Sequence, residues 1–289
     1  SFFILFLVFT FIKKLQTLGQ GKNNVSSGNI ALFLSLIFLV HPIVTQAVSW
    51  IPARGDILLA IFLLLSAICF SDYLLKQKSK HLIGHLFFLF LALFSKETAF
   101  VSPVFFILYL YLFSDKRLFN RTNTILLSGW IAVSILWFWL RQNAISSAGI
   151  EDTSFVKILG IVSNNISAIP LYVGKMLLPI NMSVFPLLKD SSLIYGLVTM
   201  GIISFYAVWN RSGLTKYFFI GLVWMILFLA PITLNYDDPS QMAFFEHRAY
   251  LPLIGFLIMA LDFVPKLNLK HGKIFGAGLV SLLAVITYN

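Results

Sequence analysis

The sequence has little charge and almost no cysteine. Charged residues make up 11% of the 289 residues, whereas a soluble globular domain typically carries about 25%. The single cysteine, Cys69, cannot form a disulfide within the chain, so cysteine usage does not indicate a redox compartment. A Walker loop, a GxGxxG motif after a strand, an HExxH motif and spaced cysteine ligands are all absent. These absences argue against a soluble nucleotide-binding or zinc-dependent enzyme.

Hydrophobic residues are abundant instead. They form 59% of the chain, which includes 30 phenylalanines and has a mean hydropathy of +0.90. A membrane-spanning helix needs about 20 mostly apolar residues. The apolar runs cover residues 1–12, 29–46, 56–75, 82–95, 98–113, 124–141, 193–209, 217–234, 248–263 and 274–287. We therefore predict an all-α fold: a polytopic transmembrane helix bundle of about ten spans.

The two ends of the chain lie inside or beside apolar runs. The run over 1–12 is too short for a full span and begins without Met or a signal peptide, and the last run stops close to residue 289. We expect residues 1–289 to form a single transmembrane domain that is truncated at both ends.

The stretch 155–178 is apolar but carries a polar cluster at its centre. The cluster consists of Ser163, Asn164, Asn165, Ser167 and Pro170. A helix facing lipid would rarely place these groups at mid-depth, because lipid offers them no hydrogen-bond partners. We therefore predict an extracytoplasmic re-entrant or surface-lying helix over 155–178.

The distribution of basic residues supports this topology. If 155–178 does not cross, the loops 13–28, 76–81, 114–123, 210–216 and 264–273 share one side and hold most of the lysines and arginines. The loops 47–55, 96–97, 142–192 and 235–247 lie on the other side, where acidic and basic residues nearly balance. Basic loops face the cytoplasm in membrane proteins. The net charge of +10 therefore reflects topology and does not indicate nucleic-acid binding.

Ionisable residues at the edge of the apolar zone are costly, and they suggest function. His41 precedes Pro42, which ends or kinks an apolar helix. Arg54 and Asp56 bracket the start of the next helix, where they could instead pair with each other or cap the helix. These residues are candidates for an outward-facing site.

Three further outer segments carry charge. Lys96 and Glu97 are wedged between two apolar runs, where a tight turn with a local ion pair is the alternative to a functional role. Lys175 lies on an apolar helix end, and we expect it to extend toward the interface.

The segment Glu246-His247-Arg248 opens an apolar run. The planar guanidinium of Arg248 can donate two parallel hydrogen bonds, an arrangement that suits a phosphate. Consecutive residues on a helix point in different directions, so these three cannot all face one ligand equally.

Four segments in this order resemble a known family. They are HPIVTQAVSWIPARGDIL, FSKETAFVSPVFFILYLYLF, YVGKMLLPINMSVFP and FFEHRAYLPLIGFLIM. They resemble the membrane half of bacterial proteins that join a GT-C-type glycosyltransferase domain to tetratricopeptide repeats. Eukaryotic relatives are the transmembrane and tetratricopeptide-repeat O-mannosyltransferases of the endoplasmic reticulum. The family often has Glu at the position of Gln46.

The resemblance implies a glycosyltransferase of the bacterial inner membrane with its active site facing the periplasm. The donor would be a sugar, with mannose as one candidate, on a polyprenyl phosphate, and the acceptor a protein or glycan hydroxyl. The catalytic base would be an acidic residue in the first outer loop, which this chain lacks together with the tetratricopeptide repeats. Asp237 and Asp238 lie in a different loop and do not match that base.

Within this framework the outer residues receive provisional roles. The donor phosphate would be bound by Arg248, Lys96, Arg54 and His247, and the orienting or sugar-binding residues would be Glu246, Glu97, His41 and Asp56. No metal ligands are assigned and no particular cofactor is named, and the use of a divalent metal stays open. The expected partners are the lipid-linked donor, the acceptor and membrane lipid, with no nucleic acid.

Other functions stay open. A lipid-linked glycan transporter or flippase would show internal repeats and ionisable residues at mid-membrane, and neither is evident. An O-antigen ligase or polymerase would need catalytic residues in the loop 142–192. A non-catalytic membrane subunit is the remaining alternative.

Overall fold

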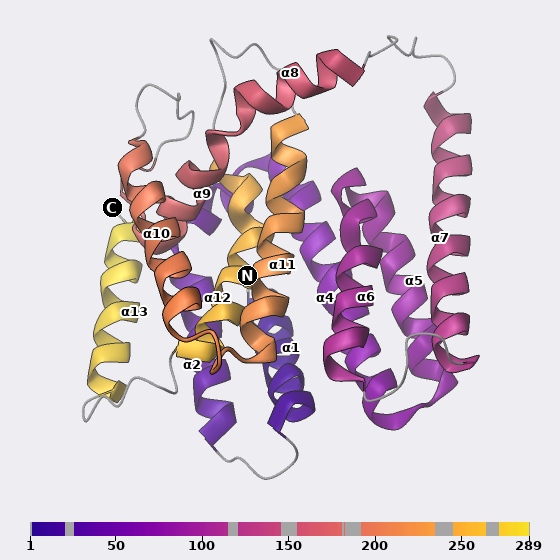
Figure 1. Ribbon diagram of the computed structural model, residues 1–289, viewed down its shortest axis with the longest axis horizontal. Helices are drawn as coiled ribbons and strands as arrows, with labels where there is room; N and C mark the ends of the chain where they lie inside the picture. Colours follow the sequence, from indigo (N-terminus) through magenta and orange to yellow (C-terminus); the bar gives the residue numbers. More distant parts are fainter. Residues whose placement is uncertain are drawn as a thin grey trace.

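The computed structural model describes residues 2–20, 26–114, 121–145, 155–180, 182, 192–234, 245–263 and 272–288. These residues are predominantly helical and include no strand, which confirms the all-α prediction. The longer helices are α1 (Phe2–Gln20), α2 (Ser26–Val40), α4 (Arg54–Lys76), α5 (Ser79–Ser95), α6 (Ser102–Phe113), α7 (Arg121–Ile145), α10 (Leu193–Trp209), α11 (Lys216–Leu229), α12 (Tyr250–Phe263) and α13 (Gly272–Tyr288). They run alongside one another and alternate in direction (Figure 1).

Short elements gather at one end of the bundle. They are α3 (Thr45–Ser49), α8 (Phe155–Asn165), α9 (Ala168–Leu177) and the 3-10 helices η1 (Pro42–Val44), η2 (Ile51–Ala53), η3 (Glu97–Val101), η5 (Ala230–Leu234) and η7 (Glu246–Ala249). We call this end, which α8 crosses at the top of Figure 1, the α8 end. The opposite end, which carries the turns at 77–78 and 210–215, is called the basic end.

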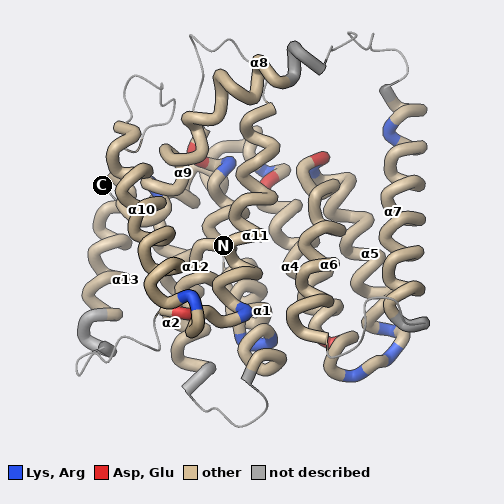
Figure 2. Tube along the Cα trace, in the orientation of Figure 1, with Lys and Arg blue, Asp and Glu red and all other residues tan. Residues whose placement is uncertain are grey.

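Charged residues concentrate at these two ends, and the middle of the bundle is nearly free of them (Figure 2). Lys76, Lys78 and Lys80 lie in or beside the turn at 77–78, and Arg211 and Lys216 lie in or beside the turn at 210–215. The described parts of the two sets of loops defined by charge therefore fall at opposite ends of the bundle.

The number of membrane spans differs from the prediction. Four helical segments are long and apolar enough to cross a membrane: Phe2–Gly19, Ile51–Lys76, Asn123–Ala144 and Lys216–Leu234. The pair Gly28–Val40 and Pro42–Ser49, bent by 57°, makes a fifth if it is one span. The other apolar helices have only 10–17 residues, below the about 20 that a span needs. Membrane association is supported, whereas a count of about ten spans is not.

The stretch 155–178 does not form the predicted single helix, and nothing supports its re-entrant placement. It divides at a turn over 166–167 into α8 and α9. The Asn165 amide donates a hydrogen bond to the Thr233 carbonyl at 3.2 Å, so part of the polar cluster is satisfied by η5. Helix α9 then approaches α10 backbone to backbone, since a Cβ on Gly174 would lie 2.7 Å from the Gly196 nitrogen.

The outer helices expose large apolar side chains. On α7 these include Ile131, Ile135 and Trp139, and on α10 they include Ile202 and Phe205. Soluble monomers rarely expose contiguous apolar surface of this kind. The exposed faces therefore suit contact with lipid.

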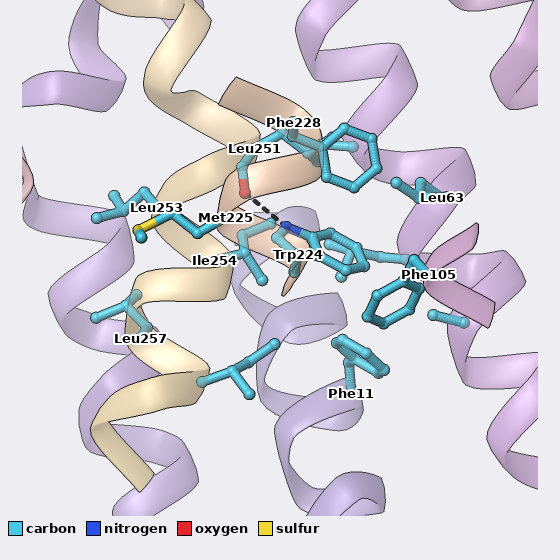
Figure 3. Close-up of a cluster of buried hydrophobic side chains, with 14 of the residues drawn as sticks. Phe11, Leu63, Phe105, Trp224, Met225, Phe228, Leu251, Leu253, Ile254 and Leu257 are labelled. Atoms are coloured by element: carbon cyan, nitrogen blue, oxygen red, sulfur yellow. Dashed lines mark hydrogen bonds between the residues drawn. The ribbon is translucent and has the colours of Figure 1, made fainter. Parts of the chain in front are cut away.

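The core lies where α1, α4, α6, α11 and α12 meet (Figure 3). Trp224 is fully buried at its centre and donates a hydrogen bond from Nε1 to the Leu251 carbonyl at 2.8 Å. Beside it, α11 and α12 approach closely: a Cβ on Gly221 would lie 2.5 Å from the Gly255 oxygen, and one on Gly255 would lie 2.6 Å from the Gly221 oxygen. This rigid core holds the start of α12, and therefore η7, at the α8 end.

Candidate functional site

The break between α2 and α4 brings His41 and Asp56 to the α8 end. His41 is the N-cap of η1, and its Nδ1 accepts a hydrogen bond from the Ile43 amide at 3.2 Å. Its Nε2 therefore carries the proton and donates to the Met176 carbonyl of α9 at 3.1 Å. Both ring nitrogens are used by the backbone, so His41 joins η1 to α9 and does not present a nitrogen to a ligand.

Asp56 and Lys96 form the centre of the candidate site. The Lys96 ammonium lies 2.7 and 2.8 Å from the two Asp56 carboxylate oxygens. The start of α4 lies beside the end of α5, since a Cβ on Gly55 would be in ordinary van der Waals contact with the Ser95 carbonyl, at 3.4 Å. Asp56 is buried, and its Oδ2 also lies 3.9 Å from His247 Nε2. One carboxylate thus faces cationic or polar groups from two other segments.

Arg54 and Glu97 lie outside this cluster. Arg54 is exposed and forms no ion pair with a carboxylate in the described part of the chain, so the alternative of an Arg54–Asp56 pair is wrong. Glu97 has a side chain 62% exposed and pairs with Arg141 of α7 at 2.8 Å. The alternative of a local Lys96–Glu97 pair is also wrong. The structure brings neither Arg54 nor Glu97 to the Asp56–Lys96 contact.

Helix α9 holds η7 through two side chains. Lys175 is 6% exposed and Glu246 is 4% exposed, and the Lys175 ammonium lies 2.7 Å from Glu246 Oε1. The Tyr172 hydroxyl donates a hydrogen bond to the Phe245 carbonyl at 3.0 Å. Burial raises the pKa of Tyr172, so this hydroxyl keeps its proton. The expectation that Lys175 extends to the interface is wrong, because its charge is neutralised inside the protein.

His247 is buried and neutral. Gln46 Oε1 accepts a hydrogen bond from the His247 amide at 2.9 Å and lies 3.3 Å from the ring Nδ1. Burial, with the nearby positive charges of Lys96 and Arg248, lowers the pKa of His247 to about 4. With its Nδ1 proton directed to Gln46, the ring leaves Nε2 as an acceptor. His247 therefore suits a hydroxyl better than an anionic phosphate.

Arg248 is the cation of this cluster that keeps an unbalanced charge. Its Cζ lies 5.3 Å from the centroid of the Phe245 ring. It forms no ion pair with any carboxylate among the described residues, whereas Lys96 and Lys175 are each paired with one. The N–H donors of the half-buried guanidinium are thus available to bind an anion.

We call His247, Arg248, Asp56 and Lys96 the η7 cluster, with Lys175 and Glu246 behind it. The sequence pointed to all of these residues. It did not predict that Lys175 pairs with Glu246, and it gave no role to Tyr172. Tyr172 and Lys175 are three residues apart on one helix face, a spacing visible in the sequence. Their partners lie 73 and 71 residues further along the chain, so no local pattern identifies them.

The described residues hold no group of three or more His, Cys, Asp or Glu side chains that could bind a metal ion. Asp237 and Asp238 lie outside the described residues.

Comparison of the chain with protein-family models, with curated proteins and with solved structures finds no match. The chemistry of the η7 cluster is therefore interpreted from its own geometry.

Proposed function

We propose that this protein is a GT-C-like glycosyltransferase that moves a sugar from a polyprenyl-phosphate donor to a protein or glycan hydroxyl outside the cytoplasm. The observation that carries the proposal is the uncompensated Arg248 guanidinium beside the Asp56–Lys96 pair and neutral His247. A sugar–phosphate–lipid diester carries one negative charge, which one guanidinium can balance. The resemblance of four sequence segments to this enzyme class supports the same assignment.

The reaction would break the bond between the sugar anomeric carbon and the phosphate oxygen. The acceptor oxygen bonds to that carbon, and its proton passes to a base. By resemblance, that base is an acidic residue of the first outer loop of the family. The lipid phosphate leaves with a second negative charge, and Arg248 stabilises this developing charge at a half-buried position where its field is strong. Lys96, fixed by Asp56, adds a second positive pole, and His247 Nε2 accepts a hydrogen bond from a sugar hydroxyl.

In the proposed arrangement the basic end faces the cytoplasm and the α8 end faces the periplasm across a bacterial inner membrane. The shorter apolar helices also cross, assisted by their neighbours, and α8 lies along the outer surface. This placement brings the η7 cluster to the level of the outer lipid headgroups, where a polyprenyl-phosphate sugar can reach it. Proteolysis or cysteine labelling from each side of sealed vesicles tests the sidedness.

The substitution Arg248→Ala tests the function in protein expressed from its own gene and reconstituted into liposomes. We expect transfer from a polyprenyl-phosphate sugar to fall by about 10- to 100-fold, because a hydrogen bond to a charged group is lost in the transition state. The assay measures labelled sugar on the acceptor.

Arg141→Ala is the matched control. Arg141 lies at the same end of the bundle and its Cζ is 5.4 Å from the Trp137 ring, but it pairs with exposed Glu97. Unchanged transfer in Arg248→Ala, or an equal loss in both variants, would contradict the assignment. Movement of the lipid-linked sugar across the bilayer without transfer would point to a transporter.

A further inference from the structure

His247 and Asp56 face each other across a short gap. His247 Nε2 lies 3.9 Å from Asp56 Oδ2, which is beyond hydrogen-bond distance. The tautomer of the ring is fixed by Gln46, whose Oε1 accepts the His247 backbone N–H at 2.9 Å and lies 3.3 Å from Nδ1. Because that oxygen is an acceptor, Nδ1 carries the ring proton and Nε2 presents a lone pair beside the carboxylate. Two acceptors therefore meet with no hydrogen between them.

The surroundings hold both groups in place. Lys96 donates hydrogen bonds to the two Asp56 oxygens at 2.7 and 2.8 Å. The ring centroids of Trp50 and Phe245 lie 5.2 and 5.4 Å from that of His247. Among the described residues, Nε2 of His247 has no hydrogen-bond donor. The His247 and Asp56 side chains are each 10% exposed, so the gap is open to a ligand.

The chemistry of the gap restricts what it can hold. A buried acceptor without a donor is costly, and the Asp56 carboxylate repels an anion such as phosphate. A single hydroxyl carries one hydrogen, so it satisfies only one of the two acceptors. Two hydroxyls on adjacent carbons of a sugar ring supply two hydrogens from neighbouring oxygens. The carboxylate has lone pairs left for one of them, because Lys96 takes only two of about four.

We propose that the gap between His247 and Asp56 is a hydroxyl-recognition site that selects a donor hexose with free hydroxyls on two adjacent ring carbons. One hydroxyl donates to His247 Nε2 and its neighbour donates to Asp56 Oδ2, while Arg248 binds the phosphate of the same donor. The inference rests on the proposed function of the η7 cluster and narrows its sugar to this class. A sugar that lacks either hydroxyl leaves one acceptor without a hydrogen and binds less tightly.

A series of deoxy sugars tests this recognition through binding, without requiring transfer. The protein in lipid nanodiscs is titrated with polyprenyl phosphate, with polyprenyl-phosphate mannose, and with analogues of the latter that each lack one hydroxyl. We expect Kd to rise about fivefold for the analogue that lacks the hydroxyl facing neutral His247, and about tenfold or more for the one that lacks the hydroxyl facing the Asp56 carboxylate. The two missing hydroxyls must belong to adjacent carbons.

The variant His247→Phe keeps an aromatic ring and removes the Nε2 acceptor. We expect its Kd for the mannose lipid to rise about fivefold, and its Kd for bare polyprenyl phosphate to change less than about twofold, since that phosphate is bound by Arg248. The analogue without the hydroxyl facing His247 should lose no further affinity in this variant, because both partners of one contact are then absent.

Two further variants complete the series. His247→Gln places an amide oxygen where it can accept a hydrogen bond and should recover part of the affinity, which also provides a second variant if His247→Phe does not fold. The matched control is His81→Phe in α5 at the basic end, which makes the same change far from the gap and should bind every lipid as the wild type does.

Equal affinity for all the analogues, losses confined to hydroxyls on non-adjacent carbons, or a mannose lipid that binds no tighter than bare polyprenyl phosphate would each overturn the inference and leave water as the occupant of the gap. Equal weakening of both lipids in His247→Phe would also overturn it, because the ring would then act through structure alone. If the wild type discriminates as expected but transfers no sugar, the hydroxyl site stands and the proposed function fails. If it transfers sugar but binds every analogue alike, the proposed function stands and this inference fails.

Discussion

The two ends of the molecule differ in how deeply they bury their ion pairs. At the basic end, Asp72 accepts both Lys14 at 2.6 Å and Lys76 at 2.9 Å, and the Lys76 side chain is 51% exposed. At the α8 end, the Lys96–Asp56 and Lys175–Glu246 pairs join residues 40 and 71 positions apart. The basic end has positive charge in excess and tolerates water around it. The Lys175–Glu246 pair of the α8 end is the more deeply buried, with side chains 7% and 5% exposed, against 22% and 14% for Lys14 and Asp72.

The energies of the two kinds of pair differ accordingly. An exposed pair contributes about 0–1 kcal/mol, whereas breaking a buried pair costs about 3–5 kcal/mol because one charge is left without a partner. Substitutions at the α8 end should therefore affect both folding and activity. The same substitutions at the basic end should affect neither strongly.

The largest expected difference is between Glu246→Gln and Asp72→Asn. Glu246→Gln removes the carboxylate from the buried Lys175–Glu246 pair and should lower the free energy of unfolding by about 3 kcal/mol, the lower limit for buried pairs, with loss of transfer. Asp72→Asn should cost about 1 kcal/mol or less. Denaturation in detergent measures both. Equal losses in the two variants would abolish the distinction between the ends.

A second difference concerns pH. The pKa of His247 is about 4 in the folded protein and about 6.5 when unfolded. The unfolded chain therefore binds a proton that the folded one rejects, so stability is complete above about pH 6.5 and is lost as the pH falls toward 4. We expect the loss of stability from this group to reach roughly 3 kcal/mol near pH 4.

The variant His247→Gln should show a shallower loss of stability than the wild type over this range. Thermal denaturation at a series of pH values measures the difference, and parallel curves for the two proteins would count against a neutral, buried His247. Lys14→Met at the basic end provides the control curve, because it removes no group that titrates in this range.

The smallest expected effect is that of Arg54→Ala. The sequence placed Arg54 among the phosphate-binding residues, but its side chain is exposed and its charge is screened by solvent. We expect transfer to change less than about twofold, since surface charges contribute little. A loss comparable to that of Arg248→Ala would show that the donor extends over the start of α4.

Much of the fold follows from local signals in the sequence. Each predicted apolar run forms a helix in the described residues, and basic and mixed loops separate to opposite ends, because hydropathy and loop charge depend on neighbouring residues. Span length was predicted less well. Helix α2 ends where Pro42 follows, and Lys96 adopts an extended conformation at φ −160° that separates α5 from η3. These breaks leave helices shorter than the apolar runs suggested.

The sequence predicted which residues gather at the candidate site better than it predicted which of them contact one another. The sequence identified Asp56, Lys96, His247 and Arg248 because charged and polar residues at apolar borders are conspicuous. The same signal also pointed to His41, Arg54 and Glu97, which lie outside the η7 cluster. It could not show that Lys96 turns toward Asp56 while its neighbour Glu97 turns toward Arg141. Such choices depend on which helix lies next to which, and that arrangement is set by close contacts such as Gly221 with Gly255.

The 3-10 geometry of η7 has a consequence for how this region can vary. Such a helix has about three residues per turn, so consecutive side chains are about 120° apart. Accordingly, Glu246 contacts Lys175 of α9, His247 contacts Gln46 of α3, and Arg248 lies over the Phe245 ring. Inserting or deleting one residue would rotate every side chain into its neighbour's direction. Relatives of this chain should therefore vary in side-chain chemistry at these positions while keeping the length of the segment constant.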